Sequence, residues 1–178
     1  LSPEQNAAMM AGGTADGDLA KKLAPLAHRH GCALLLAGEG DAGRLDGVHV
    51  ETGLAGIRAA IAGHHPDRIV GAGGIQTRHD AMDFGEAGAD YVFFGRLDGD
   101  AAPGIDPKAM ELAAWWADLF EVPAMVMGGS DIASVREAAA AGVEFVALRN
   151  AVWTNADGAA AAVVAACRLL GTATEVDR

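Results

Sequence analysis

Three apolar, strand-like runs end in glycine, and these glycines are the residues whose spacing first suggests chemistry. They lie in Val70-Gly71-Ala72-Gly73-Gly74, in Phe94-Gly95 and in Val126-Met127-Gly128-Gly129. In parallel α/β folds the carboxyl ends of strands carry the ligand site, because the helices beyond them begin with free backbone N–H groups. Glycine lets such groups approach phosphate oxygens, although a single glycine there equally accompanies a tight turn. Three glycine-ended strands favour an anion site.

The last two strands carry the groups best suited to one phosphate. Gly128 and Gly129 precede a helix that Ser130 or Asp131 would cap, and Arg149 and Asn150 follow the next strand. Arg149 can donate a bidentate, charge-assisted contact and Asn150 a neutral one. The sequence therefore predicts a phosphate site made of Gly128, Gly129, Arg149 and Asn150. The alternative is an ion pair between Arg149 and a nearby acid at the rim.

Other polar residues at strand ends offer further chemistry. His49 closes a short apolar run and is expected either to transfer a proton or to be a hydrogen-bonded structural histidine. Several acidic residues also lie beyond strand ends, and two of them would suffice to anchor a magnesium ion. These acids are Glu39, Asp41, Glu51, Asp98 and Asp100.

An alternation of short apolar runs and alanine-rich helical segments positions these residues. The predicted strands are 32–37, 47–50, 68–72, 90–94, 123–127 and 145–148. The predicted helices are 18–30, 52–62, 77–87, 106–120, 130–141 and 155–170. Thr77, Asp106 and either Ser130 or Asp131 are expected as helix caps, with Pro107 in the first helical position. Nearly continuous apolar strands between helices indicate a parallel sheet covered by helices.

The predicted fold class is α/β, a TIM (β/α)8 barrel in which the first two strands are missing or unobserved. Six strands can be identified, whereas a closed barrel needs eight. We expect one barrel domain over residues 18–178, with 1–17 an N-terminal remnant of uncertain structure. An open, doubly wound sheet of flavodoxin type is the alternative.

Composition limits the partners. The chain has 178 residues, 51% of them hydrophobic, and a formal charge of -11, which disfavours nucleic acid and anionic lipid. Its apolar runs are too short to span a bilayer, so we expect a soluble protein. The expected location is the cytoplasm, and the expected ligand is a phosphorylated small molecule. Cys32 and Cys167 are expected to be buried, unpaired thiols.

Four blocks carry a resemblance to a known family. They are Asp46-Gly47-Val48-His49, Gly88 to Gly95, Pro123 to Gly129 and Gly142 to Ala151. In order and spacing they resemble the strand signatures of the thiamine phosphate synthase family. That resemblance implies a TIM barrel that joins a pyrimidine pyrophosphate to a thiazole phosphate with magnesium, and the family's relatives include a thiazole tautomerase.

The resemblance also assigns residues, and some of them depart from the family pattern. Ala37-Gly38 replaces an Asn-Asp pair, which leaves Glu39 and Asp41 as displaced magnesium ligands. Gly73 stands where the family has serine, and Arg96 stands where the tautomerases have histidine. The residues expected around the substrate are Gly73, Gly74, Arg96 and His49. A Thr-x-Thr-Lys loop of the family is rewritten here as the acidic stretch Arg96 to Asp100.

Two functions follow as hypotheses. The first is a thiamine phosphate synthase-type transferase, and the second is a catalytically silent paralogue that binds a phosphorylated small molecule in regulation or salvage. Another phosphate-binding barrel, such as an isomerase or epimerase, stays open, because a fold does not fix chemistry. Trp115 and Trp116 adjoin on one helix, so they cannot both face the barrel, and one is expected to cover the core or a homodimer contact.

Overall fold

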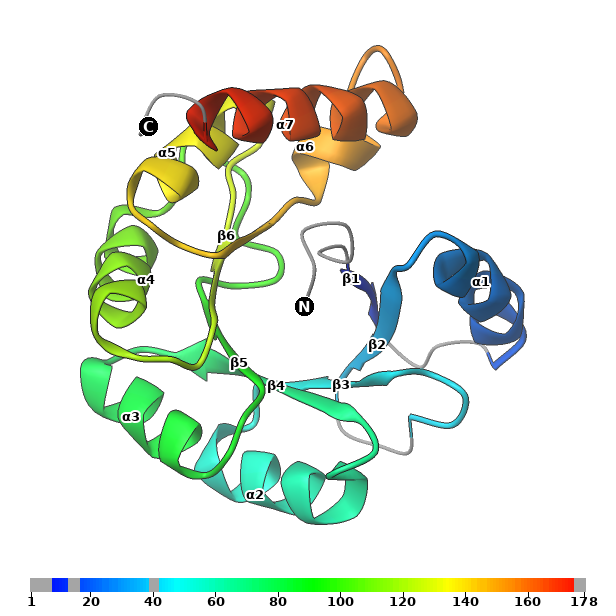
Figure 1. Cartoon of the computed structure of the whole chain (residues 1–178), viewed down its shortest axis with the longest axis vertical. Helices are drawn as coiled ribbons and strands as arrows, with labels where there is room; N and C mark the ends of the chain where they lie inside the picture. The colour runs from blue at the N-terminus through cyan, green and yellow to red at the C-terminus, as the bar shows by residue number, and fades with distance from the viewer. Residues whose placement is uncertain (1–7, 13–16, 39–41, 175–178) are drawn as a thin grey trace. The chain divides into compact units, whose positions relative to one another are not determined.

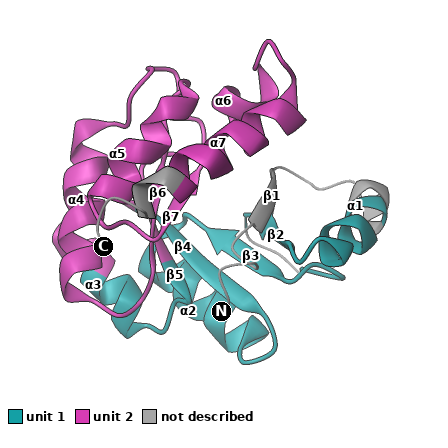
Figure 2. Ribbon diagram, turned by 45° about the horizontal axis from the view of Figure 1, so that its top comes forward, with its two compact units in different colours: residues 1–74, 82–91 teal, residues 75–81, 92–178 magenta. Residues whose placement is uncertain are grey.

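The computed structural model describes residues 8–12, 17–38 and 42–174. Two compact units make up the chain: unit 1 comprises residues 1–74 and 82–91, and unit 2 comprises residues 75–81 and 92–178 (Figure 2). Each unit contains parallel strands connected through helices, as the alternation in the sequence predicts.

Unit 1 contains four parallel strands that pair in chain order (Figure 1). The strands are β1 (Ala8–Gly12), β2 (Ala33–Ala37), β3 (Gly47–Val50) and β4 (Ile69–Ile75), the last residue of which belongs to unit 2. Helix α1 (Gly17–Arg29) follows β1, and α2 (Gly53–His64) follows β3. Helix α3 (Arg78–Glu86) follows β4 and ends within this unit.

Strand β1 adds a strand to the six that the sequence predicts. It pairs with β2 from Ala8 opposite Ala33 to Gly12 opposite Ala37. The pattern missed it because its sequence, Ala-Met-Met-Ala-Gly, has none of the β-branched or aromatic residues that favour strands. Part of the stretch whose structure the sequence left uncertain, residues 1–17, is therefore strand.

Unit 2 contains all of β5 (Tyr91–Phe94) except Tyr91, and this strand is followed by β6 (Ala124–Met127) and β7 (Phe145–Ala147) in parallel pairing. The helices are α4 (Pro107–Leu119), the 3-10 turn η1 (Ile132–Ser134), α5 (Val135–Ala140), α6 (Asn150–Trp153) and α7 (Ala159–Thr174). Helix α7 packs on α5 and α6 (Figure 1). The helix predicted over 130–141 is thus a 3-10 turn joined to a shorter α-helix, and α6 was not predicted.

The burial of whole strands explains why their sequences are continuously apolar. Every residue of β3, β5 and β6 is buried, on both faces of the strand. Parallel strands covered on both faces need apolar residues at consecutive positions instead of an alternating pattern.

The predicted helix caps form as expected. The Asp106 carboxylate accepts a hydrogen bond from the N–H of Ala109 at 2.9 Å, with Pro107 in the first turn. Asp131 accepts from the N–H of Ala133 at 2.9 Å. These side chains satisfy N–H groups that have no partner inside their own helix.

At three places, a carboxylate directly before one strand accepts a hydrogen bond from a backbone N–H at the start of the preceding strand. Asp46 Oδ2 accepts from the N–H of Leu34 at 2.8 Å, and Asp90 Oδ2 accepts from the N–H of Val70 at 2.7 Å. In unit 2, Glu144 Oε2 accepts from the N–H of Ala124 at 2.9 Å. These contacts lie at the amino ends of strands, the edge that serves stability in barrels.

Two of these carboxylates also bind a histidine. His28 Nε2 lies 2.9 Å from Asp46 Oδ2, and His65 Nε2 lies 2.9 Å from Asp90 Oδ2. These histidines therefore have structural partners at the amino edge.

The adjacent tryptophans on α4 differ in environment, as expected. Trp116 is buried, stacks on Phe120 with ring centroids 4.0 Å apart, and donates from Nε1 to the carbonyl of Val122 at 2.7 Å. Trp115 is half-buried, and the Arg78 guanidinium lies 4.8 Å from its ring centroid. Trp116 thus covers the core.

The two cysteines are free, as predicted, but their burial differs from the prediction. Cys32 is half-buried, whereas Cys167 is exposed. Cys167 lies on α7, and the apolar composition of that helix made it look buried although one side faces solvent. None of the helices in the described part of the chain combines the length and apolar character that crossing a bilayer requires.

Candidate functional site

A buried histidine is the centre of the polar residues in unit 1. His49 on β3 has no exposed surface, and its Nδ1 lies 2.9 Å from the hydroxyl of Tyr91, which is also buried. The two rings stack with centroids 5.7 Å apart. On the other side of the imidazole, Nε2 lies 3.7 Å from Oε1 of the exposed Glu51. The imidazole therefore connects a buried phenol with a solvent-accessible carboxylate.

Glycine in β4 provides the space for this histidine. A Cβ at Gly73 would lie 2.6 Å from His49 Nε2, closer than any real side chain could come. Gly73, expected to contact substrate, therefore has a clear structural role beside His49. Gly74, the next residue, is exposed.

Burial raises the pKa of Tyr91 far above its ordinary value, and the negative charges of Asp90 and Glu51 raise it further. The phenol is therefore neutral over the physiological pH range and keeps its proton for the hydrogen bond with His49. This contact fixes the orientation of the imidazole.

In unit 2 the backbone after β6 is already hydrogen-bonded. Gly128 N–H donates to the carbonyl of Ala147 at 2.8 Å, and Gly129 N–H donates to the buried Ser134 hydroxyl at 3.1 Å. A side chain at Gly129 would collide with the carbonyl of Pro103. Glycine is thus required here because another part of the backbone approaches closely.

That approaching backbone also uses the next two N–H groups. Ser130 N–H donates to the carbonyl of Ala102 at 2.7 Å, and Asp131 N–H donates to the carbonyl of Pro103 at 3.2 Å. The loop after β5 is therefore bound where the sequence predicts a phosphate.

The Asp100 carboxylate lies against the other half of the predicted phosphate site. Its Oδ1 is 3.1 Å from Arg149 Nη2 and 3.2 Å from Arg149 Nε, and it accepts from Asn150 Nδ2 at 3.2 Å. Its Oδ2 accepts from the backbone N–H of Asn150. The side chain of Asp100 is fully buried, whereas that of Arg149 is 47% exposed. The ion pair with an acid, which was the alternative for Arg149, is what this structure contains.

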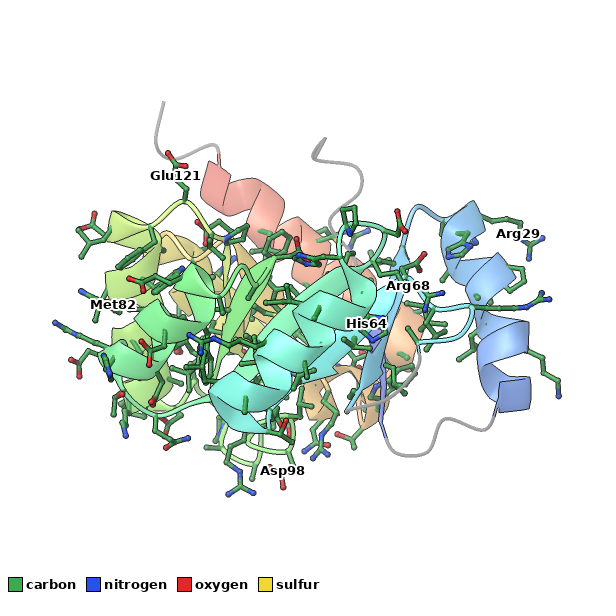
Figure 3. All side chains as sticks on the ribbon, turned by 90° about the horizontal axis from the view of Figure 1, so that it is seen from below. Arg29, His64, Arg68, Met82, Asp98 and Glu121 are labelled. Atoms are coloured by element: carbon green, nitrogen blue, oxygen red, sulfur yellow. The ribbon has the colours of Figure 1, made fainter. Side chains whose placement is uncertain are left out.

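Arg96 lies in the same loop with a different partner. Its Nε and Nη2 donate to Asp98 at 2.9 and 3.0 Å. The hydrogen bonds and charge of Arg96 lower the pKa of Asp98, which extends outward from the ribbon (Figure 3). Both side chains are exposed, so this pair contributes little to stability.

Three of the acids that the sequence offers for magnesium have other partners in the structure. Within the described ranges, no group of three or more potential ligands comes together. Asp100 is engaged by Arg149 and Asn150, Asp98 by Arg96, and Glu51 lies beside His49. Glu39 and Asp41, the predicted ligands, lie outside the described residues.

A pocket of about 270 Å³ in unit 1 lies away from these polar groups. Val48 and Val50 of β3 and the small residues Ala59 and Ala60 of α2 line part of it. Val48 and Val50 alternate with His49 along the strand, so they face the opposite side of the sheet. His64 also lines the pocket, and none of the described site residues does.

The structure thus places the predicted residues in two groups. His49, Gly73 and Gly74 belong to unit 1, whereas Gly128, Gly129, Arg149 and Asn150 come together in unit 2 with Arg96 in the neighbouring loop. The sequence did not identify Tyr91 or Asp100 as partners. Two features of the sequence could have pointed to them: the single tyrosine of the chain lies in an apolar strand, and Asp100 lies in an acidic loop.

Comparison with known sequences decides the family. A profile described as thiamine monophosphate synthase matches residues 14–152. The chain belongs to the thiamine monophosphate synthase family. A thiamine-phosphate synthase of Hyphomonas neptunium is 34% identical over 142 residues, which are 78% of this chain and 64% of the relative. One from Rhodospirillum centenum is 37% identical over 121 residues, 66% of this chain and 58% of the relative. The chain therefore spans less than two thirds of these curated relatives.

Solved structures confirm the fold class. Thiamine phosphate pyrophosphorylase from Pyrococcus furiosus superposes with a TM-score of 0.76 at 18% identity, covering 94% of this chain and 84% of that one. A 3-hexulose-6-phosphate synthase from Salmonella typhimurium superposes with a TM-score of 0.72, also at 18% identity, covering 94% of this chain and 87% of that one. The thiamine monophosphate synthase family member described here has the TIM-barrel type of α/β fold, as predicted, and its described residues include seven strands where the sequence predicts six.

Proposed function

We propose that this protein acts in thiamine biosynthesis as a thiamine-phosphate synthase-type transferase, coupling a pyrimidine pyrophosphate to a thiazole phosphate. The observation that carries the proposal is the family match over residues 14–152, which includes the ends of β3 to β7. In this reaction the thiazole nitrogen displaces pyrophosphate from the pyrimidine, so the protein must hold two anionic substrates.

The thiazole phosphate is assigned to unit 2. Its phosphate would be held by the N–H groups after β6, by the Arg149 guanidinium and by Asn150. The pairing of Arg149 and Asn150 with a carboxylate in the structure supports this assignment, because the same donors suit a phosphate. Gly74 and Arg96, which are both exposed, are each proposed to contact substrate, whereas the buried His49 and Gly73 are proposed to act by shaping the end of the strands.

The proposal also includes a magnesium ion and a cytoplasmic location. A magnesium ion would be held by Glu39 and Asp41, the ligands that the sequence predicts, since Glu51, Asp98 and Asp100 have other partners. Its role would be to neutralise the departing pyrophosphate. A biosynthetic role of this kind agrees with a cytoplasmic protein.

The test is a coupled assay of the purified protein with both precursors. Thiamine phosphate and pyrophosphate should form in equal amounts, and omission of magnesium should abolish both. R149Q should raise KM for the thiazole phosphate about tenfold or more, because a charged hydrogen bond to the phosphate is lost. R58Q, which alters an exposed arginine on α2, is the control and should leave KM unchanged. If no thiamine phosphate forms in the presence of magnesium, whichever substrate is added first, the proposal is wrong.

A second candidate is a silent paralogue that binds a phosphorylated small molecule without turnover. Two observations favour it: the loop after β5 is acidic where the family has a lysine, and Asp100 pairs with Arg149. Calorimetry with thiazole phosphate would then show binding, while the coupled assay and rescue of a thiamine-auxotrophic strain would both fail.

A further inference from the structure

A segment of the chain itself occupies the anion-binding groups of unit 2. The Asp100–Pro103 segment supplies a carboxylate and two carbonyl oxygens to these donors. The carboxylate of Asp100 pairs with Arg149 and accepts hydrogen bonds from Asn150. The carbonyls of Ala102 and Pro103 accept hydrogen bonds from the N–H groups of Ser130 and Asp131. These donors come from two separate strand ends and converge on one short stretch of loop.

The chemistry of the contact resembles phosphate binding. A carboxylate between a guanidinium, a side-chain amide and a backbone N–H has the donor set that recognises a phosphate oxygen. Asp100 is fully buried although it is charged, and such a residue is stable only when its oxygens are hydrogen-bonded and its charge is balanced. Removing the carboxylate would leave the same donors facing an uncharged space.

We infer that Asp100 is a specificity-determining residue, an internal anion that competes with phosphorylated ligands for Arg149 and Asn150. The inference rests on the proposed function, which assigns the ligand phosphate to these groups. As a tethered group, Asp100 acts at a high effective concentration, so free phosphate must displace it. Phosphate binding therefore requires the Asp100–Pro103 segment to leave, and the ligand must offer additional contacts elsewhere to outcompete it.

The test is calorimetry with inorganic phosphate and with pyrophosphate at constant ionic strength. D100N keeps the size of the side chain and removes its charge, and should bind phosphate at least about tenfold more tightly than the wild type. The matched control is D118N, which removes one negative charge from an exposed position on α4 of the same unit, and should stay within about twofold of the wild type. The double variant D100N/R149Q should lose the gain.

Three results would overturn the inference. They are no gain in D100N although it unfolds thermally like the wild type, an equal gain in D118N, or a gain that survives R149Q. If D100N does not fold, limited proteolysis of the wild type decides: saturating pyrophosphate should speed cleavage within the Asp100–Pro103 segment, because displacement releases it, and unchanged cleavage would contradict displacement. The coupled assay separates the two proposals, because absence of thiamine phosphate in every variant removes the proposed function but leaves the anion result intact.

Discussion

The hydroxyl of Tyr91 and Nδ1 of His49 lie 2.9 Å apart, and both side chains are buried. Their positions are 42 residues apart in the chain, yet the stacked rings share one polar contact. Loss of such a hydrogen bond destabilises the folded protein mainly because it leaves a buried polar atom without its partner.

The variant Y91F tests that contact directly. It keeps the ring and removes the hydroxyl, so we expect the free energy of unfolding to fall by about 1–3 kcal/mol, as measured in urea. F93Y, which introduces a hydroxyl on the same strand in a fully buried ring, is a useful comparison, because there the added hydroxyl has no established partner. If Y91F unfolds at the wild-type urea concentration, the hydrogen bond contributes nothing to stability.

The same residue predicts an alkaline loss of stability. The pKa of Tyr91 is raised above 10.0 in the folded state, so on raising the pH the unfolded chain releases this proton first. The stability associated with the neutral phenol is complete below about pH 10 and is lost as the pH rises toward the folded pKa. The difference in unfolding free energy between wild type and Y91F should therefore shrink above about pH 10. A difference independent of pH up to the unfolding limit would contradict the burial of a neutral phenol.

The carboxylate of Asp90 should be important for stability at the amino edge. It accepts from the N–H of Val70 and contacts His65, so D90A would leave a strand N–H of β4 without its acceptor. We expect a loss of about 1–3 kcal/mol in chemical denaturation. D67A, at an exposed acid before the same strand, should change stability by less than about 0.5 kcal/mol. Equal effects of the two variants would mean that the strand contact is unimportant.

Local signals explain which parts of the fold the sequence could predict. The caps at Asp106 and Asp131 depend on residues two or three positions away, so the sequence could predict Asp106 and could narrow the second cap to Ser130 or Asp131. The contact between Asp100 and Arg149 joins residues 49 positions apart, and no local pattern encodes it. The sequence could name Arg149 as an anion-binding group, because its place at a strand end is a local property. It could not say that the anion in this structure would come from the chain itself.

The pairing of Arg149 with Asp100 also predicts a stability change. R149Q leaves the buried carboxylate with only the Asn150 donors, so we expect a loss of about 2 kcal/mol, tempered by the partial exposure of Arg149. In a double-mutant cycle the effect of R149Q should largely vanish in the D100N background, since the charge that Arg149 balances is gone. Additive effects in thermal or urea unfolding would show that the two side chains are energetically independent.

Lowering the pH should destabilise the first turn of α3, because Asp80 becomes protonated. Thr77 Oγ1 accepts from the N–H of Asp80 at 3.1 Å, and Asp80 Oδ2 accepts from the N–H groups of Thr77 and Gln76 at 2.8 and 3.0 Å. This reciprocal arrangement is a capping box. Burial acts to raise the pKa of Asp80, but the hydrogen bonds with Thr77 and Gln76 outweigh it and hold the pKa below 3.8.

A folded pKa below the unfolded one means that the carboxylate stabilises the protein above the unfolded value of 3.8 and that this contribution is lost as the pH falls through the folded pKa. D80A should cost about 1 kcal/mol at neutral pH, the usual loss for a removed helix cap, and its deficit relative to the wild type should diminish below about pH 4. D118N provides the control, because Asp118 is exposed and lies near the end of α4. A D80A deficit that stays constant down to acid unfolding would show that the charge of Asp80 does not stabilise the helix, and that only its packing does.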